Sequence, residues 1–239
     1  MSKGIAPYIM AGDGGIQTLL PTIEFLQKNG ATMIEVGIPF SDPVADGPVI
    51  QEAGLRALQA NVTLQDVLQE ITLHKARIHI PLVIMCYANP IYAFGIESFA
   101  KACDEANIKG VIIPDVPLEE ELAFSSPLKA YQIPFIRFIT LTSPKERIAT
   151  IIENAEGFIY AVTVKGTTGE RASYDQTIFE LLKEVKAMSH IPVYAGFGIH
   201  TKEQITQFHE VCDGVIIGSK IVQALHHKDY ESITKLLAP

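Results

Sequence analysis

The chain has 239 residues, of which 48% are hydrophobic and 19% are charged, and its formal net charge is −8. This length suits one α/β domain of the barrel kind, and the acidic balance argues against charge-driven binding to nucleic acid or an anionic membrane. We expect a cytoplasmic protein, because no apolar run is as long as a membrane span and the N-terminus lacks the features of a signal peptide. The spacing of Cys86, Cys103 and Cys212 fits neither a zinc site nor a redox motif, so we expect reduced, partly buried thiols.

Short apolar runs alternate with helical patterns along the whole chain. Eight of these runs are expected to be strands, at residues 5–10, 33–37, 82–87, 111–113, 135–140, 158–162, 192–195 and 215–217. Apolar residues at helical spacing predict helices between and after the strands, at residues 16–26, 50–60, 63–77, 96–107 and 175–188. A further helix is expected to end at about residue 130, and three more are expected to start at residues 143, 201 and 218. Near-continuous apolar strands are typical of a parallel sheet that is buried on both faces.

Three helix starts carry strong local signals. Thr63 and Thr201 are each followed, three residues later, by a side chain that can complete a capping box. The segment Ser143-Pro144-Lys145-Glu146 combines an N-cap serine, a proline for the first helical position and a capping-box glutamate. We therefore expect side-chain capping at all three positions.

The order of elements predicts the fold. Eight consecutive strand–helix units, each of roughly 30 residues, are what a right-handed parallel βαβ repeat requires. They close most simply into a (β/α)8 TIM barrel, of class α/β, with residues 1–239 forming a single domain. An open doubly wound sheet is the alternative, but no dinucleotide-binding fingerprint follows the first strand.

Glycine-containing loops follow the seventh and eighth expected strands, where barrels often bind phosphate. These are Gly196-Phe197-Gly198 and Gly218-Ser219, and the segment 166–169 can add a lid from the sixth loop. Glycine permits close backbone approach, and the free amides of a helix start attract an anion. Either glycine pair alone can be a simple turn, but the two together in a barrel favour a phosphate site.

Two acidic residues stand out near the end of the second strand. Glu35 lies inside an apolar strand, where burial should raise its pKa so that it can carry a proton at neutral pH. Asp46 follows in the next loop and can face the same cavity as part of an acid/base pair. The alternatives are a structural glutamate paired with a basic residue, and a solvated turn or helix-capping aspartate.

Other candidate groups give weaker signals. Tyr8, Tyr87 and Phe197 fall at strand ends, where aromatic residues usually belong to the core but can also form an apolar pocket for a flat ring. The seven histidines follow no catalytic or ligand spacing, so most are expected on the surface and no metal site is predicted. No lysine stands inside an apolar strand, as a Schiff-base lysine would.

The segment 35–48, with the sequence Glu-Val-Gly-Ile-Pro-Phe-Ser-Asp-Pro-Val-Ala-Asp-Gly-Pro, resembles the signature of tryptophan synthase α subunits. The resemblance covers nearly the whole chain, through the segments 85–90, 113–117, 166–169, 196–198 and 218–219. It implies a barrel lyase that cleaves indole-3-glycerol phosphate to indole and glyceraldehyde 3-phosphate. Indole would pass to a β subunit that carries pyridoxal phosphate, in an α2β2 heterotetramer, with no cofactor or metal on this chain.

The resemblance also implies residue roles. Glu35 would be the main acid/base and Asp46 the second carboxylate. Residues beside the indole would be Tyr160, Tyr8, Met85 and Phe197, and those around the phosphate would be Gly169, Gly198, Gly218 and Ser219. Residues facing the β subunit would be Pro39, Asp42, Asn89 and Pro117.

Two departures from the family pattern leave alternatives open. Only a few residues precede the first strand, where family members commonly have an extra helix. In the sixth loop, Val164 stands where arginine is common, and Thr167 replaces a usual apolar residue. These departures motivate a different hypothesis, in which the chain acts mainly as a binding and activating module for the β subunit, with weak activity alone. Another phosphate-binding barrel enzyme, such as a sugar-phosphate epimerase or aldolase, lacks support because its metal histidines or strand lysine are missing.

Overall fold

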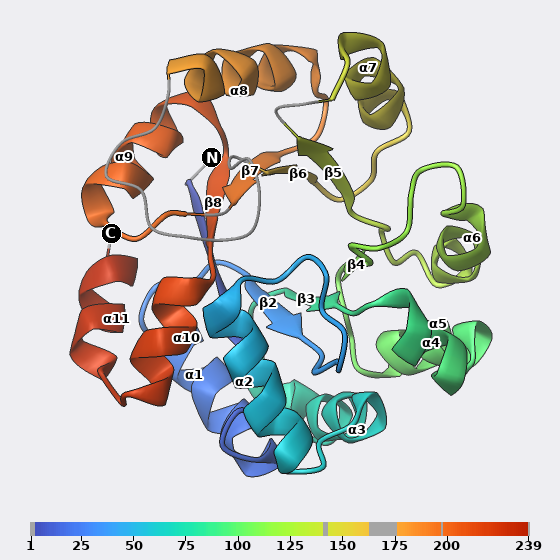
Figure 1. Cartoon of the computed structure of the whole chain (residues 1–239), viewed down its shortest axis with the longest axis vertical. Coiled ribbons are helices and arrows are strands. Elements are labelled where there is room, and N and C mark those ends of the chain that lie inside the picture. Colours follow the sequence, from blue (N-terminus) through green and yellow to red (C-terminus); the bar gives the residue numbers. More distant parts are fainter. Residues whose placement is uncertain (1–2, 141–142, 163–175, 197, 239) are drawn as a thin grey trace.

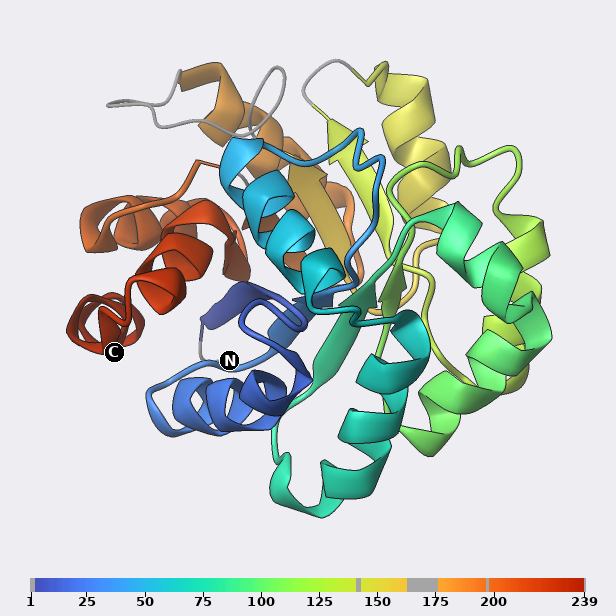
Figure 2. The ribbon, with the colours of Figure 1, turned by 60° about the horizontal axis from the view of Figure 1, so that its bottom comes forward.

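The computed structural model describes residues 3–140, 143–162, 176–196 and 198–238. Within these ranges the strands form one parallel sheet, with bounds β1 Gly4–Met10, β2 Ile34–Gly37, β3 Leu82–Met85, β4 Val111–Ile112, β5 Arg137–Thr140, β6 Ile159–Val162, β7 Val193–Gly196 and β8 Gly214–Ile217. Helices surround the strands (Figures 1 and 2). Their bounds are η1 Ile16–Thr18, α1 Leu19–Lys28, α2 Pro48–Gln59, α3 Leu64–His74, η2 Lys75–Arg77, α4 Ala88–Phe94, α5 Ile96–Glu105, α6 Leu122–Ala130, α7 Lys145–Glu153, α8 Gln176–Met188, α9 Lys202–Val211, α10 Ser219–His226 and α11 Tyr230–Leu237.

The sheet closes on itself between β4 and β5. Hydrogen-bonded neighbours follow the order β4-β3-β2-β1-β8-β7-β6-β5. The two ends meet where Val111 pairs with Phe135 in a parallel bridge. There the Val111 amide donates to the Pro134 carbonyl at 2.9 Å, and the Ile136 amide donates to the Val111 carbonyl at 2.8 Å. The predicted (β/α)8 barrel is therefore confirmed, and the doubly wound alternative is wrong.

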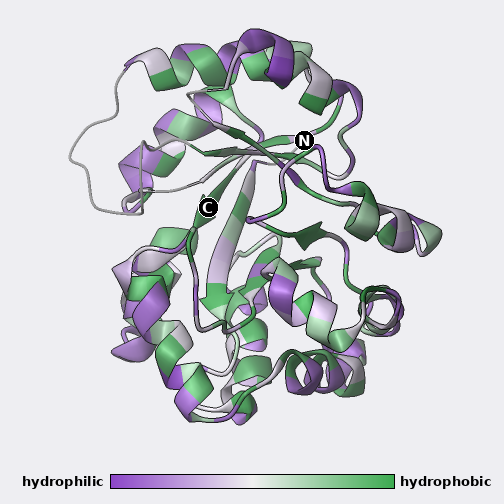
Figure 3. Ribbon diagram, turned by 45° about the vertical axis from the view of Figure 1, so that its right-hand side comes forward, coloured by the Kyte–Doolittle hydropathy of each residue, from purple (hydrophilic) through white to green (hydrophobic). Residues whose placement is uncertain are grey.

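Alternation along the strands produces an inner and an outer core. Ile34 and Val36 belong to the outer core between strands and helices, whereas the inner core contains Tyr8 and Val83. Glu35 lies between Ile34 and Val36, and the parallel register places it beside Tyr8 and Val83. Its side chain is therefore directed into the barrel. Along the surrounding helices, hydrophobic and hydrophilic residues interchange (Figure 3), as amphipathic helices packed on a barrel require.

Helix capping agrees with the sequence at two of the three positions. Thr63 and Thr201 each accept a hydrogen bond from the amide three residues later and form complete capping boxes on α3 and α9. The expected capping by Ser143 is wrong, because Pro144 occupies the N-cap of α7 and no side-chain cap is made. The Ser143 hydroxyl instead lies 3.0 Å from the Thr140 hydroxyl, at the end of β5.

Two helices were not expected from the sequence. The short helix α4 follows β3 directly and is separated from α5 by Gly95, whose φ of 91° interrupts helical geometry. The helix α11 ends the described chain and packs on α10. Cys86, Cys103 and Cys212 are free, as expected, but fully rather than partly buried. In the part of the chain that the structure describes, no helix combines the length and apolarity needed to cross a membrane.

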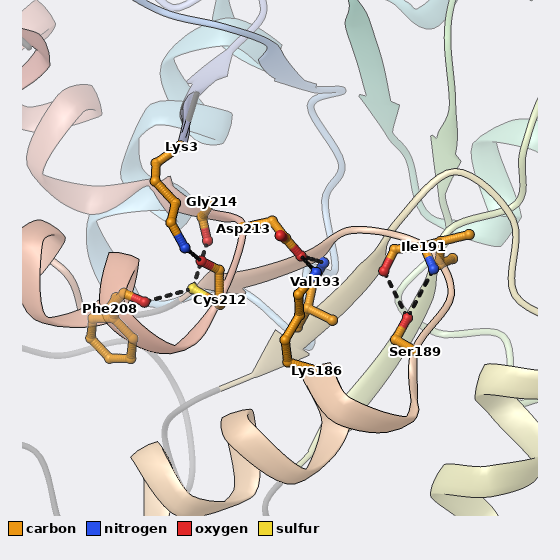
Figure 4. A network of polar contacts seen from close by, with 9 residues as sticks. All are labelled: Lys3, Lys186, Ser189, Ile191, Val193, Phe208, Cys212, Asp213 and Gly214. Atoms are coloured by element: carbon orange, nitrogen blue, oxygen red, sulfur yellow. Dashed lines mark hydrogen bonds and ion pairs between the residues drawn. The ribbon is translucent and has the colours of Figure 1, made fainter. Parts of the chain in front are cut away.

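A polar network fixes the N-terminal end of the barrel (Figure 4). Asp213 accepts hydrogen bonds from the Val193 amide at 2.8 Å and from Lys186 Nζ at 2.5 Å. Lys3 Nζ donates to the Cys212 carbonyl at 2.6 Å. These contacts join the starts of β1, β7 and β8, so Lys3, Lys186 and Asp213 have structural partners.

Candidate active site

A cavity of about 270 Å³ lies at the end of the barrel where the strands finish. Eight of the residues proposed from the sequence line it, namely Tyr8, Glu35, Asp46, Met85, Tyr160, Gly198, Gly218 and Ser219. These residues come from β1, β2, β3 and β6, from the loops after β2, β7 and β8, and from the first residue of α10. The cavity therefore occupies the position at which parallel barrels assemble their active sites. Phe197 and Gly169 lie outside the described residues, as do Val164 and Thr167.

Glu35 is a buried acid that has no basic partner among the described residues. Its exposed fraction is 3%, and within the described ranges it makes no ion pair. Its Oε2 atom is buried and has no hydrogen-bond partner among the described residues. Burial, with a smaller contribution from the nearby Asp46 charge, raises the pKa of Glu35 from 4.5 to about 8. Glu35 is thus protonated at neutral pH and directed into the cavity.

Asp46 reaches the same cavity from the loop between β2 and α2. It is 8% exposed, so it is not a solvated turn residue, and the N-cap of α2 is Gly47 with no side-chain cap. Its Oδ2 atom accepts a hydrogen bond from the Tyr87 hydroxyl at 3.0 Å. Burial raises the pKa of Asp46 to about 6, and the Tyr87 hydrogen bond opposes this rise. The two carboxyl groups therefore titrate in different pH ranges.

Tyrosine rings form part of the cavity wall. A Cβ atom added at Gly37 would lie 1.9 Å from the Tyr8 hydroxyl oxygen, and one at Gly196 would lie 2.3 Å from Cε2 of Tyr160. Glycine at these two strand ends therefore provides the space that the rings occupy. Burial raises the pKa of both Tyr8 and Tyr160, so both hydroxyls stay protonated. The result is an apolar cavity with hydroxyl groups near the two carboxyl groups.

Several cavity residues were missed from the sequence. Phe138 and Thr140 enter from β5, and the Phe138 ring centroid lies 4.9 Å from that of Tyr160. Their spacing of two residues along an apolar strand was the available signal, because alternate residues face the barrel interior. His200 also lines the cavity, although the sequence predicted that most of the histidines lie on the surface. Its position shortly after the seventh strand was the corresponding signal.

The start of α10 borders the opposite side of the cavity. Gly218 is the N-cap of this helix, and Ser219 is its first residue. Gly218 has a φ of −97° and a ψ of −89°, outside the usual helical and extended regions, which glycine tolerates. Among the described residues other than its chain neighbours, the atom nearest to an added Cβ is Tyr8 Cβ at 3.8 Å, so the backbone here is open to close approach by a ligand. The first amides of a helix have no intrahelical partner and suit an anion such as phosphate.

The residues assigned to a partner surface differ in exposure. Asp42, Asn89 and Pro117 are exposed, whereas Pro39 is buried in the isolated chain. All four follow the C-terminal ends of β2, β3 or β4, at the same end of the barrel as the cavity. In the described ranges, no group of three His, Cys, Asp or Glu side chains is arranged to hold a metal ion.

Comparison with known proteins gives a consistent result. A family model described as "Tryptophan synthase alpha chain" matches residues 2–238. A protein of that name from Oceanobacillus iheyensis is 49% identical over 231 residues, which cover 97% of this chain and 88% of that protein. The structure of Mycobacterium tuberculosis tryptophan synthase is similar with a TM-score of 0.90 at 31% identity, covering 99% of this chain and 90% of that chain. A tryptophan synthase complex from Pyrococcus furiosus gives a TM-score of 0.86 at 29% identity, covering 99% of this chain and 98% of that chain.

Proposed function

The chain belongs to the tryptophan synthase alpha chain family, and from this membership we propose which of its residues carry out the reaction. The reaction is the cleavage of indole-3-glycerol phosphate to indole and glyceraldehyde 3-phosphate, a lyase step in tryptophan biosynthesis. It is a retro-aldol cleavage of the bond between indole C3 and the glycerol carbon. The ring accepts the electron pair of that bond only after C3 has been protonated.

We assign both proton transfers to Glu35. In its protonated form, Glu35 donates a proton to indole C3 and becomes a carboxylate. The carboxylate then takes the proton of the hydroxyl on the carbon next to C3. The O–H electron pair forms the aldehyde C=O, the C–C bond breaks, and its electron pair restores the aromatic indole. Glu35 ends protonated, and a pKa of about 8 lets both of its forms be reached near neutral pH.

We assign charge stabilisation to Asp46. Protonation at C3 places positive charge on the ring, which is shared by the ring nitrogen. An ionised Asp46 that accepts the ring N–H hydrogen bond stabilises this charge, and burial strengthens the interaction. The pKa of about 6 leaves Asp46 mostly ionised at neutral pH.

Substrate binding is assigned to the rest of the cavity. Tyr8, Met85, Tyr160 and Phe197 are proposed to surround the indole ring, with Phe197 lying outside the described residues. Gly169, Gly198, Gly218 and Ser219 are proposed to hold the phosphate, and the first amides of α10, at the edge of the cavity, support this assignment. Gly169 also lies outside the described residues.

The burial of two acids with different pKa values in one cavity is the observation that carries this assignment. The test is Glu35→Gln, which keeps the size of the side chain but can neither donate nor accept the catalytic proton. We expect kcat for indole release to fall by about a thousandfold or more, with little change in binding of a substrate-like phosphate ligand. Glu97→Gln, at an exposed position on α5, is the matched control. Turnover of Glu35→Gln near the level of this control would exclude the assigned role.

We also propose the setting in which the enzyme works. The complex from Pyrococcus furiosus is named a tryptophan synthase complex, which supports a β-subunit partner. We propose an α2β2 assembly in the cytoplasm, with pyridoxal phosphate on the β subunit, no cofactor on this chain, and residues 1–239 as one domain. The exposed Asp42, Asn89 and Pro117, with the neighbouring Pro39, are the proposed contacts. Indole production measured with and without a purified β subunit tests the assembly, because a true partner should change the rate.

A further inference from the structure

Tyr87 is a buried tyrosine whose ring and hydroxyl both contact the loop between β2 and α2. It follows β3 at the N-cap of α4, and its exposed fraction is 1%. Its hydroxyl donates a hydrogen bond to Asp46 Oδ2 at 3.0 Å and accepts one from the Ala45 amide at 3.0 Å. Its ring stacks on Phe40, with centroids 5.1 Å apart and an interplanar angle of 30°.

We propose that Tyr87 is a positioning residue for the cleavage, which holds the Asp46 carboxylate in the cavity by fixing the loop that carries it. This inference rests on the proposed role of Asp46. Tyr87 is not among the residues that line the cavity, so it acts through Asp46 rather than on the substrate.

The hydrogen bonds of the loop support this role. Among the described residues, the Tyr87 hydroxyl is the group that binds the Asp46 carboxylate. The other contacts of Asp46 involve its backbone, because its amide donates to the Pro43 carbonyl at 3.2 Å and its carbonyl accepts from Gln51 Nε2 at 2.9 Å. Those contacts fix the main chain, and among the described residues the direction of the carboxylate is set by Tyr87. One carboxylate oxygen is then held, and the other is left for the ring N–H of the substrate.

The titratable groups around Asp46 show how the Tyr87 hydroxyl affects the ionisation of the Asp46 carboxyl group. Glu35 and Asp46 are both acidic, and Tyr8 and Tyr160 add buried hydroxyls at the same cavity. Asp115 lies beyond Tyr87, where it accepts a hydrogen bond from the Ala88 amide at 3.0 Å. The His200 imidazole also lines this cavity, but among the described residues the hydrogen bond to the Asp46 carboxylate comes from the Tyr87 hydroxyl. Burial raises the pKa of Tyr87 itself, so it stays a donor, and its hydrogen bond favours the ionised form of Asp46.

The test is Tyr87→Phe, which removes the hydroxyl but keeps the ring against Phe40. We expect kcat at neutral pH to fall by about ten- to a hundredfold with a small change in KM, because the substrate does not touch Tyr87. We also expect the acidic limb of the pH–rate profile to move to higher pH, because Asp46 loses the donor that favours its ionised form. Tyr92→Phe is the matched control, since it removes a hydroxyl from an exposed position on the same helix α4.

Asp46→Asn and the double variant separate this inference from the proposed function. If Tyr87 acts through Asp46, then Tyr87→Phe lowers kcat in the wild-type background but adds almost nothing to Asp46→Asn. If Asp46→Asn loses activity while Tyr87→Phe keeps the wild-type pH profile, the positioning role is excluded and the role of Asp46 stands. If Asp46→Asn has near-normal turnover, the role of Asp46 is itself wrong. An equal loss from Tyr87→Phe in both backgrounds shows a general structural effect and overturns the inference.

Thermal unfolding of each variant shows whether it is folded at the assay temperature. If Tyr87→Phe does not fold, Phe40→Leu is the second test. It removes the ring that stacks on Tyr87 but keeps the Tyr87 hydroxyl, the Ala45 amide and the Asp46 carboxylate. We expect Phe40→Leu to lower kcat by a smaller factor, and again only when Asp46 is present. A loss that is equal in the Asp46→Asn background overturns the inference here as well.

Discussion

The burial of Glu35 should make the stability of the protein depend on pH in a specific way. The pKa of this carboxyl is about 8 in the folded chain and ordinarily 4.5. A raised pKa means that the folded state binds the proton more tightly than the unfolded state does. The stabilisation from proton binding is therefore complete below about pH 4.5 and is lost as the pH rises through about 8. Glu35→Gln has no proton to lose, so its stability lacks this contribution.

The size of the effect follows from the two pKa values. Between about pH 5 and pH 7.5, the wild-type protein should lose about 3 kcal/mol of unfolding free energy relative to Glu35→Gln. Urea denaturation of both proteins at these two pH values measures the difference. Contributions from Asp46 and the surface acids are common to both proteins and largely cancel. Glu97→Gln, at an exposed position, is the control for the loss of an acidic side chain. Parallel stability curves for wild type and Glu35→Gln would refute the burial of an acid with a raised pKa.

Two further outcomes follow from the cavity. Cleavage needs Asp46 ionised and Glu35 protonated, so kcat/KM should rise as the pH passes about 6 and fall as it passes about 8. Outside this interval kcat/KM should decline about tenfold per pH unit, and steady-state rates across the pH range measure the profile. A monotonic profile would show that the two groups do not act as a pair. Gly218→Ala should raise KM by about tenfold or more if the phosphate approaches this backbone, and thermal unfolding shows whether the variant is folded in the assay. An unchanged KM would remove Gly218 from the phosphate site.

The sequence predicts the position of Glu35 because alternation is a local rule. Its neighbours along the strand are apolar and face the helices, so the glutamate must face the barrel interior. The position of Asp46 is not set by a local rule, because it depends on the path of a loop and on Tyr87, which follows β3. Sequence spacing cannot indicate a hydrogen-bond partner for the Tyr87 hydroxyl, so the sequence predicts only a core aromatic or a part of an apolar pocket at this position.

The features that the sequence did not predict correctly have similar physical causes. Helix α4 is short and contains Pro90, so it lacks the apolar periodicity that identifies longer helices. At α7, the signal of Ser143 competes with Pro144, and the serine hydroxyl lies near Thr140 rather than at the helix start. The cavity position of His200 depends on where the loop after β7 directs it. Such positions are set by tertiary contacts, which one sequence does not display.

The two carboxyl groups reach one cavity by different routes, and this difference sets the order in which they ionise. Two like charges in a small buried space resist ionising together, so the group with a hydrogen-bond donor ionises first. Asp46 has that donor in Tyr87, whereas Oε2 of Glu35 has no hydrogen-bond partner among the described residues. The charge on Asp46 then helps to keep the proton on Glu35, since it raises the pKa of Glu35. The cleavage needs this arrangement, with one acid charged beside the ring nitrogen and the other protonated beside C3. Asp46→Asn should therefore lower the pKa of Glu35 and move the alkaline limb to lower pH, in addition to lowering the rate.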